Sequence, residues 1–159
     1  MKYLRLFELF EDIDEICKKY NIIDYTINPD GSIDVNSSIS LYNKGLTKLP
    51  LKFNKLNGHF SCSYNELTSL EGSPIEINGS FYCDDNKLTS FEFAPKRIRG
   101  YFNCDNNNIK SFEYFPIFVK DDLWCYGNPI YEVWRLFEDT TKIDLLNDCD
   151  IFRDEDTDT

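Results

Sequence analysis

A fixed repeat of 21 residues runs through the middle of the chain and constrains its fold more than any other feature. Five apolar side chains recur at this spacing without a slip, and each closes a short apolar-polar-apolar triplet. The five closing residues are Leu41, Cys62, Cys83, Cys104 and Cys125. A self-similar period of about 20 to 50 residues is typical of solenoids, in which each unit buries its apolar face against the next. The sequence therefore predicts a repeat solenoid.

The triplets predict the strands of a short parallel sheet. In the third triplet, alternation places Phe81 and Cys83 on one face and Tyr82 on the other. Strands about 4.8 Å apart would make a sheet about 20 to 25 Å across. A unit of 21 residues is too short for a full helix after the strand, and prolines close three of the units. The return path is therefore predicted to be extended or to contain a 3₁₀ turn.

A column of asparagines follows the triplets at the same spacing. Its members are Asn65, Asn86, Asn107 and Asn128, with Lys44 at this position in the first unit. An inward amide can bond backbone groups of neighbouring coils that would otherwise be buried without partners. The column predicts a buried polar ladder, and Lys44 marks the first unit as a degenerate capping repeat.

These columns resemble the short, bacterial-type leucine-rich repeats, whose pattern is L-x-L-x-x-N-x-L-T-x-L. The closest stretches run from Phe60 to Leu70 and from Phe81 to Phe91. The link Leu-Glu-Gly-Ser-Pro that ends at Pro74, with cysteine at the second core position, is similar to a subgroup found in bacteriophages and some bacteria. The resemblance covers about residues 31–135 and implies a leucine-rich-repeat fold. It implies little about function, because members of this family bind unrelated partners.

The chain is predicted to form one domain, 1–159, closed by helical caps at both ends. Residues 1–30 would form an N-terminal helical cap and the start of a hairpin that turns at Asn-Pro-Asp-Gly, and residues 31–128 would form five repeat units. Asn128 followed by proline resembles a helix start, so residues 129–152 are predicted to form a C-terminal helical cap. Residues 153–159 are acidic and non-periodic, and we expect them to be disordered.

Charge and composition exclude several classes of partner. A net charge of −11 and a pI near 4.5 disfavour nucleic acid and anionic membranes, since both require a basic surface. Acidic residues interrupt the apolar start of the chain, and no stretch is long enough to span a bilayer. We therefore expect a cytoplasmic protein, located in the host cytoplasm if a bacteriophage encodes it.

The cysteines and carboxylates invite a metal interpretation, which their spacing disfavours. Thiols in successive strands would stack about 4.8 Å apart, whereas disulfide Cβ atoms lie about 3.8 Å apart, and a linear ladder cannot surround zinc. We expect reduced thiols that act as small core side chains, and no cofactor or metal. A hard cation held between coils is the alternative to a solvated acidic ridge. The carboxylates concerned are Asp84, Asp85, Asp105 and Asp122.

Catalysis has little support in the sequence. His59 is the only histidine, and Cys62 should face the opposite side of its strand. The plain interpretation is a surface residue at the head of a strand. We therefore predict a non-enzymatic protein, and a hydrolase that uses His59 or a bound cation is a distant alternative.

The outward face of the predicted sheet carries aromatic side chains that the core does not need. Tyrosine and tryptophan are enriched among the residues that dominate protein interfaces. The predicted function is recognition of a partner protein with a basic patch, a host factor if the chain is phage-encoded. The alternative is a structural or assembly protein that docks through its apolar N-terminal arm, residues 1–10. The candidate partner-binding residues are Tyr82, Tyr101, Asn103, Trp124, Tyr126, Asp84, Asp105 and Asp122.

Overall fold

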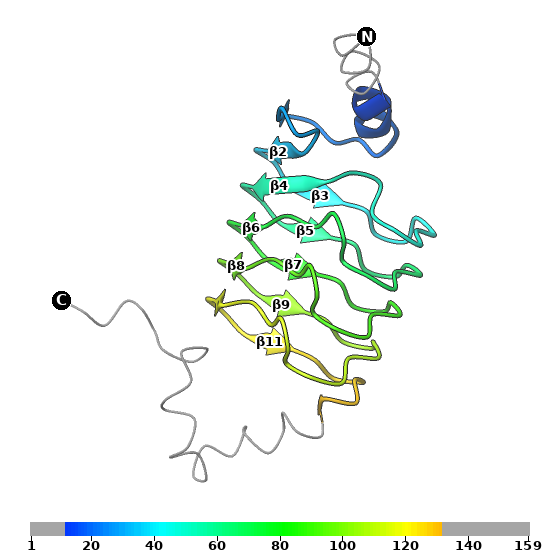
Figure 1. Ribbon diagram of the computed structural model, residues 1–159, viewed down its shortest axis with the longest axis vertical. Coiled ribbons are helices and arrows are strands. Elements are labelled where there is room, and N and C mark those ends of the chain that lie inside the picture. The colour runs from blue at the N-terminus through cyan, green and yellow to red at the C-terminus, as the bar shows by residue number, and fades with distance from the viewer. Residues whose placement is uncertain (1–11, 132–159) are drawn as a thin grey trace, which may run out of the picture.

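The 21-residue period places two short strands in each coil of the molecule. The computed structural model describes residues 12–131, and these form a β-solenoid whose coils stack along one axis (Figure 1). The predicted repeat solenoid with parallel strands is confirmed.

The triplets form the first sheet, here called sheet B, which has five parallel strands. Each strand residue pairs with the residue 21 positions away in the neighbouring strand, as in Phe60↔Phe81 and Phe81↔Phe102. The strands of sheet B are β3 (Ile39–Ser40), β5 (Phe60–Ser61), β7 (Phe81–Tyr82), β9 (Phe102–Asn103) and β11 (Leu123–Trp124).

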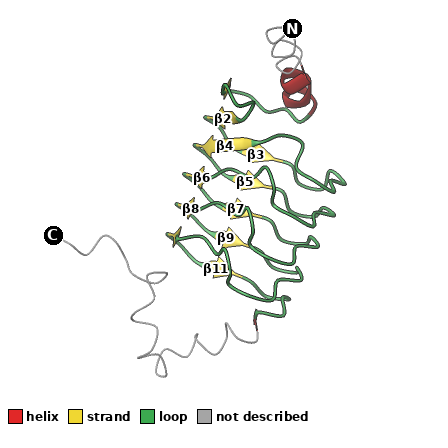
Figure 2. Ribbon diagram, in the orientation of Figure 1, coloured by secondary structure: helices red, strands yellow, loops and turns green. Residues whose placement is uncertain are grey.

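A second sheet, sheet A, occupies part of the return path. The prediction of one sheet with extended or 3₁₀ returns missed it. Figure 2 shows two columns of strands along the stacked coils, with long loops leading from strands of sheet B to the next strands of sheet A. The strand order in sheet A is β1-β2-β4-β6-β8-β10. The strands of sheet A are β1 (Tyr25–Ile27), β2 (Ile33–Val35), β4 (Phe53–Leu56), β6 (Glu76–Ile77), β8 (Arg97–Ile98) and β10 (Phe118–Val119).

Glycines make the corner between the two sheets. Gly79 lies between β6 and β7, and a Cβ atom there would approach the Gly58 carbonyl oxygen to 2.5 Å. A Cβ atom on Gly58 would lie 2.6 Å from the Ser38 nitrogen. These contacts are far shorter than ordinary van der Waals separations, so the coils of Gly58 and Gly79 can stack this closely only because these two positions have no side chain.

The asparagine column forms the predicted ladder. The Asn86 Nδ2 atom donates to the carbonyl oxygens of Cys62 and Cys83, at 3.0 and 3.1 Å. Its Oδ1 atom accepts a hydrogen bond of 3.0 Å from the Leu67 backbone N–H of the preceding coil. Asn65, Asn107 and Asn128 repeat this pattern.

Aromatic rings and thiols fill the space between the sheets. The rings of Phe60 and Phe81 are 5.8 Å apart, and those of Phe81 and Phe102 are 5.5 Å apart. The cysteines that close the triplets are 0–2% exposed, as their inward positions predict. They are free thiols, and burial raises the pKa of Cys62, Cys83 and Cys104 well above the ordinary range.

The N-terminal end is closed by a helix and a hairpin. Residues 12–19 are helical and bury Ile13 and Cys17. Strands β1 and β2 form the predicted antiparallel hairpin, with Tyr25 opposite Val35. The Tyr25 hydroxyl donates to the Asp14 carboxylate at 2.5 Å, so helix and hairpin are tied together.

Other predictions for the two ends concern residues outside the described part of the chain. The arm 1–10, most of the C-terminal helical cap and the acidic tail 153–159 all fall there. The Asn128 side chain belongs to the buried ladder, as the asparagine column predicts, and its backbone carbonyl oxygen accepts a hydrogen bond of 3.0 Å from the Tyr131 N–H. Within residues 12–131, no helix has both the length and the apolar character needed to cross a membrane.

Candidate functional site

The outer face of sheet B brings two of the predicted aromatics into direct contact. The Tyr101 and Trp124 rings stack with their centroids 5.4 Å apart and their planes 17° apart. Parallel pairing brings this about, because β9 and β11 are neighbours and Trp124 lies opposite Asn103. Tyr101 is 39% exposed and Trp124 is 45% exposed, so both rings present a large apolar area to solvent.

A third aromatic, Tyr126, lies two residues beyond Trp124. It is 64% exposed, and its ring meets the Tyr131 ring edge-on at 5.3 Å. Tyr82 belongs to the same sheet but is half-buried, with its ring 6.5 Å from that of His59. Of the predicted aromatics, Tyr101, Trp124 and Tyr126 in the C-terminal coils are therefore more exposed than Tyr82.

The predicted acidic residues have different environments. Asp122 is exposed, whereas Asp84 and Asp105 are half-buried in successive coils. Burial raises the pKa of the Asp84 carboxyl, although a hydrogen bond of 2.5 Å from the Ser63 hydroxyl opposes this. Burial also raises the pKa of the Asp105 carboxyl, and the negative charge of Asp84 adds to the effect.

The Asp105 carboxylate also has a structural contact. Its Oδ1 atom accepts a hydrogen bond of 2.6 Å from the Tyr126 backbone N–H. Asn103 caps the same turn, because its Oδ1 atom accepts from the Asp105 N–H at 3.0 Å. Both side chains therefore fix the backbone that presents Tyr126, a role that the sequence did not reveal.

Ser63 and Ser80 are buried, although alternation along their strands predicts that both face outward. Ser63 is 3% exposed and donates to Asp84, while Ser80 is 2% exposed. The Ser80 hydroxyl accepts from the Tyr101 backbone N–H at 3.1 Å. The side chains of the following coil cover them, and such cover cannot be predicted from alternation within one strand.

His59 is part of the same series of hydrogen bonds between coils. Its Nδ1 atom accepts a hydrogen bond of 3.0 Å from the Ser80 backbone N–H, as the Ser38 hydroxyl accepts from the His59 N–H. The ring is thus held by a structural contact between coils. Across residues 12–131, no three His, Cys, Asp or Glu side chains gather in an arrangement able to hold a metal ion.

Sequence reasoning missed one aromatic pair. Tyr42 and Tyr64 have ring centroids 5.1 Å apart and are 47% and 50% exposed. Tyr64 has φ of 58°, in a column of left-handed residues that also holds Asp85 (φ 52°) and Asn106 (φ 52°). The sequence could have indicated this pair, because Tyr42 occupies the same repeat position as Asp84 and Asp105, which were assigned to the outer face.

The fold and this face define a class of molecule: a β-solenoid that displays a stacked aromatic pair on one parallel sheet. Comparisons of the chain with protein-family models, with curated proteins and with solved structures find no match.

Proposed function

We propose that the chain is a non-enzymatic protein-binding solenoid of the leucine-rich-repeat type, which recognises another protein through the outer face of sheet B. The stacked pair Tyr101 and Trp124 is the observation that carries the proposal. Rigid aromatic rings lose little conformational entropy on binding and bury a large area, so they dominate many interfaces.

The packing of the core favours this function over a structural role for the two rings. The phenylalanine column lies on the inner face of the sheet, where Phe60, Phe81 and Phe102 are each 0% exposed, whereas the two rings lie on the outer face. The Trp124 ring packs on the Tyr101 ring on this outer face. The pair is preorganised by stacking, which lowers the cost of ordering it on binding.

Charge indicates the chemistry of the partner. Asp122 is exposed beside the pair, and Asp84 and Asp105 lie in the same face. A partner with a basic patch would complement these carboxylates and associate faster at low salt. The resemblance to bacteriophage repeats supports a host protein as this partner, met in the host cytoplasm.

The test is capture of a partner from a native extract with the wild-type chain and with the double variant Tyr101→Ala, Trp124→Ala as baits. Tyr64→Ala is the matched control, because Tyr64 is 50% exposed and follows β5, which is not a neighbour of β9 or β11. We expect one stoichiometric partner with the wild type and the control, and its loss with the double variant. Equal capture by all three baits would show that the outer face of sheet B does not bind the partner.

Affinity for the captured partner gives a quantitative check. Each single alanine variant should weaken binding by about 1 to 3 kcal/mol in isothermal titration while changing stability by less. The affinity should also fall with rising salt if the carboxylates contribute.

A further inference from the structure

A second surface of the molecule is a groove on the return path that leads into sheet A. It has a volume of about 820 Å³ and lies between the return segments 47–53 and 68–75. Phe93, Ala94 and Lys96 of the next coil form one end of it. These residues play no part in the outer face of sheet B.

The backbone at one end of the groove is strained. Gly72, Phe93 and Tyr114 occupy one repeat position, and their φ angles are 94°, 65° and 62°. This left-handed region suits glycine and is unfavourable for aromatic residues, which have a Cβ atom. A hydrogen bond from the Ser73 hydroxyl to the Phe93 carbonyl oxygen holds the Phe93 backbone in place.

The strained residues expose their rings. Phe93 is 52% exposed and Tyr114 is 61% exposed. Ile75 and Ile117, which are 48% and 63% exposed, follow the prolines of the same return segments. Because the coils are stacked, these side chains recur from coil to coil in an apolar row that continues beyond the groove, with Lys96 between Ile75 and Ile117. Backbone strain that serves to expose an apolar ring is typical of binding sites.

The charge of the groove is opposite to that of the chain. Three lysines and one glutamate line it, whereas the whole chain has a net charge of −11. Lys52 pairs with Asp30 at 2.6 Å. Within the described part of the chain, no ion pair joins Lys48 or Lys96 to a carboxylate.

We propose that this groove binds an extended acidic segment of a partner protein, with an apolar side chain seated against Phe93 and carboxylates paired with Lys48 and Lys96. The long apolar row suits an extended peptide better than a compact ligand. The lysines supply the positive charge that an acidic segment needs for complementarity.

The test uses a fluorescein-labelled peptide in which aspartates alternate with leucine and phenylalanine, and a comparator in which lysine replaces each aspartate. Fluorescence anisotropy should show saturable binding of the acidic peptide, weakened by salt, and none of the basic peptide. Failure of the acidic peptide to bind, or equal binding of both, would overturn the proposal.

Phe93→Gly is the decisive variant. Glycine relieves the left-handed strain, so the melting temperature should stay the same or rise, while the affinity for the acidic peptide should fall about tenfold or more. The charge variant Lys48→Glu, Lys96→Glu should lose affinity to a similar extent. Wild-type affinity in both would exclude the groove.

Two controls separate this site from its alternatives. The sheet B double variant Tyr101→Ala, Trp124→Ala should bind the acidic peptide as the wild type does, and its loss of binding would place the peptide on sheet B. Sedimentation velocity of the free chain should not show self-association of a kind that the Phe93→Gly variant loses. Such self-association would identify a second copy of the chain as the occupant and contradict the proposal.

Discussion

At the scale of single residues, Asn86 shows how much of the fold depends on one side chain. Its amide satisfies two buried carbonyl groups and one buried N–H group from two coils. Asn86→Ala should therefore lower the free energy of unfolding by about 3 kcal/mol or more, since each buried group left unpaired costs about 1 to 3 kcal/mol.

Urea unfolding measures this difference, with Asn78→Ala as the matched control. Asn78 is exposed and donates to the Asn57 Oδ1 atom at 2.6 Å, so its loss should cost within about 0.5 kcal/mol. Similar losses in the two variants would mean that the buried ladder contributes no more than a surface bond.

The half-buried Asp84 carboxylate should make the folded protein less stable at neutral pH than at acid pH, whereas a carboxylate in a salt bridge has the opposite effect. Burial raises its pKa in the folded state, so folded protein takes up this proton at a higher pH than unfolded protein. The ionised carboxylate therefore costs stability at neutral pH, and this cost disappears as the pH falls through the raised pKa.

Asp84→Asn removes the charge and keeps an oxygen that can accept from Ser63. Thermal unfolding at neutral pH should show the variant to be more stable than the wild type, by less than about 1 kcal/mol because the group is half exposed. The difference should shrink toward about pH 4. The groups around this carboxylate are Ser63, Asp85 and Asp105, and a difference that grows on acidification would show that their charges do not act as described.

At the scale of structural elements, the glycine corner between the sheets fixes how closely coils approach. Gly79→Ala should lower the free energy of unfolding by about 3 kcal/mol, because the new methyl group would meet the Gly58 backbone at 2.5 Å. Gly45→Ala is the control, since nothing lies within 4 Å of a Cβ atom there and its φ is 65°.

The control isolates the conformational cost, which is about 1 kcal/mol for a left-handed position. Both variants are compared by urea unfolding under the same conditions. If Gly79→Ala costs no more than Gly45→Ala, the coils can separate at the corner without loss.

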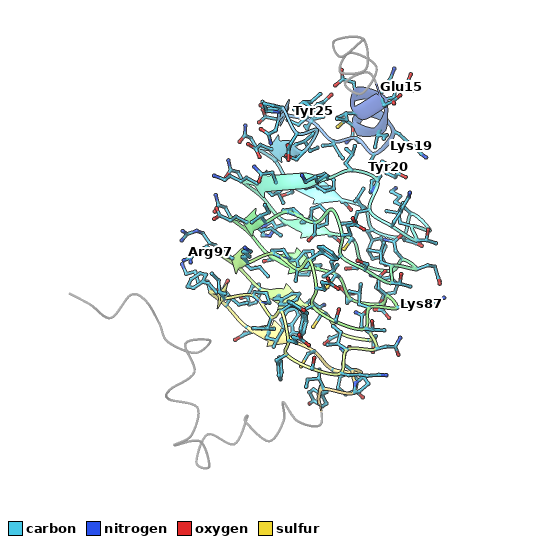
Figure 3. All side chains as sticks on the ribbon, viewed as in Figure 1. Glu15, Lys19, Tyr20, Tyr25, Lys87 and Arg97 are labelled. Carbon is cyan, nitrogen blue, oxygen red and sulfur yellow. The ribbon has the colours of Figure 1, made fainter. Side chains whose placement is uncertain are left out.

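Much of the element structure was predictable, because it depends on residue identity at a fixed spacing. The strands of sheet B, the inward thiols and the asparagine ladder all repeat every 21 residues. Sheet A was not predictable from alternation, since its strands lack a constant apolar-polar pattern: β6 (Glu76–Ile77) and β8 (Arg97–Ile98) pair a charged with an apolar residue, whereas β10 (Phe118–Val119) has two apolar residues. Its outer face is instead stabilised by pairs between coils, such as the Arg97 guanidinium 4.9 Å from the Phe118 ring. Figure 3 places Arg97 on the opposite margin of the solenoid from Lys87.

The candidate site was predictable in part for the same reason. Exposure of Tyr101 and Trp124 follows from alternation, but their stacking joins positions that are not directly paired, since Trp124 lies opposite Asn103 rather than Tyr101. The left-handed backbone of Phe93 could not be predicted, because aromatic residues rarely adopt it and the supporting Ser73 lies in the preceding coil.

At the scale of the whole molecule, each coil interacts mainly with its two neighbours, so whole units should be removable. Deletion of residues 63–83 removes one period and rejoins Cys62 to Asp84, which keeps every column in register. This variant should unfold cooperatively in urea, with an m-value reduced in proportion to the surface it no longer buries.

Deletion of residues 63–82 is the control, since it is one residue shorter than a period. The remaining coils would then be shifted by one position, which turns inward side chains outward. This variant should lose the cooperative transition. Equal behaviour of the two deletions would show that the 21-residue register is not what holds the coils together.

The antiparallel hairpin of β1 and β2 also affects whether one copy of the protein can associate with another. An open parallel edge is a template onto which another copy can add a strand, and this is a common route to fibres. At the N-terminal edge of sheet A, β1 reverses the chain direction, so the next position no longer matches the repeat. In sheet B the strand at that end, β3, has two residues and offers little backbone to pair with. A protein built from copies of one unit thus ends, at this side, in a segment onto which that unit cannot be added.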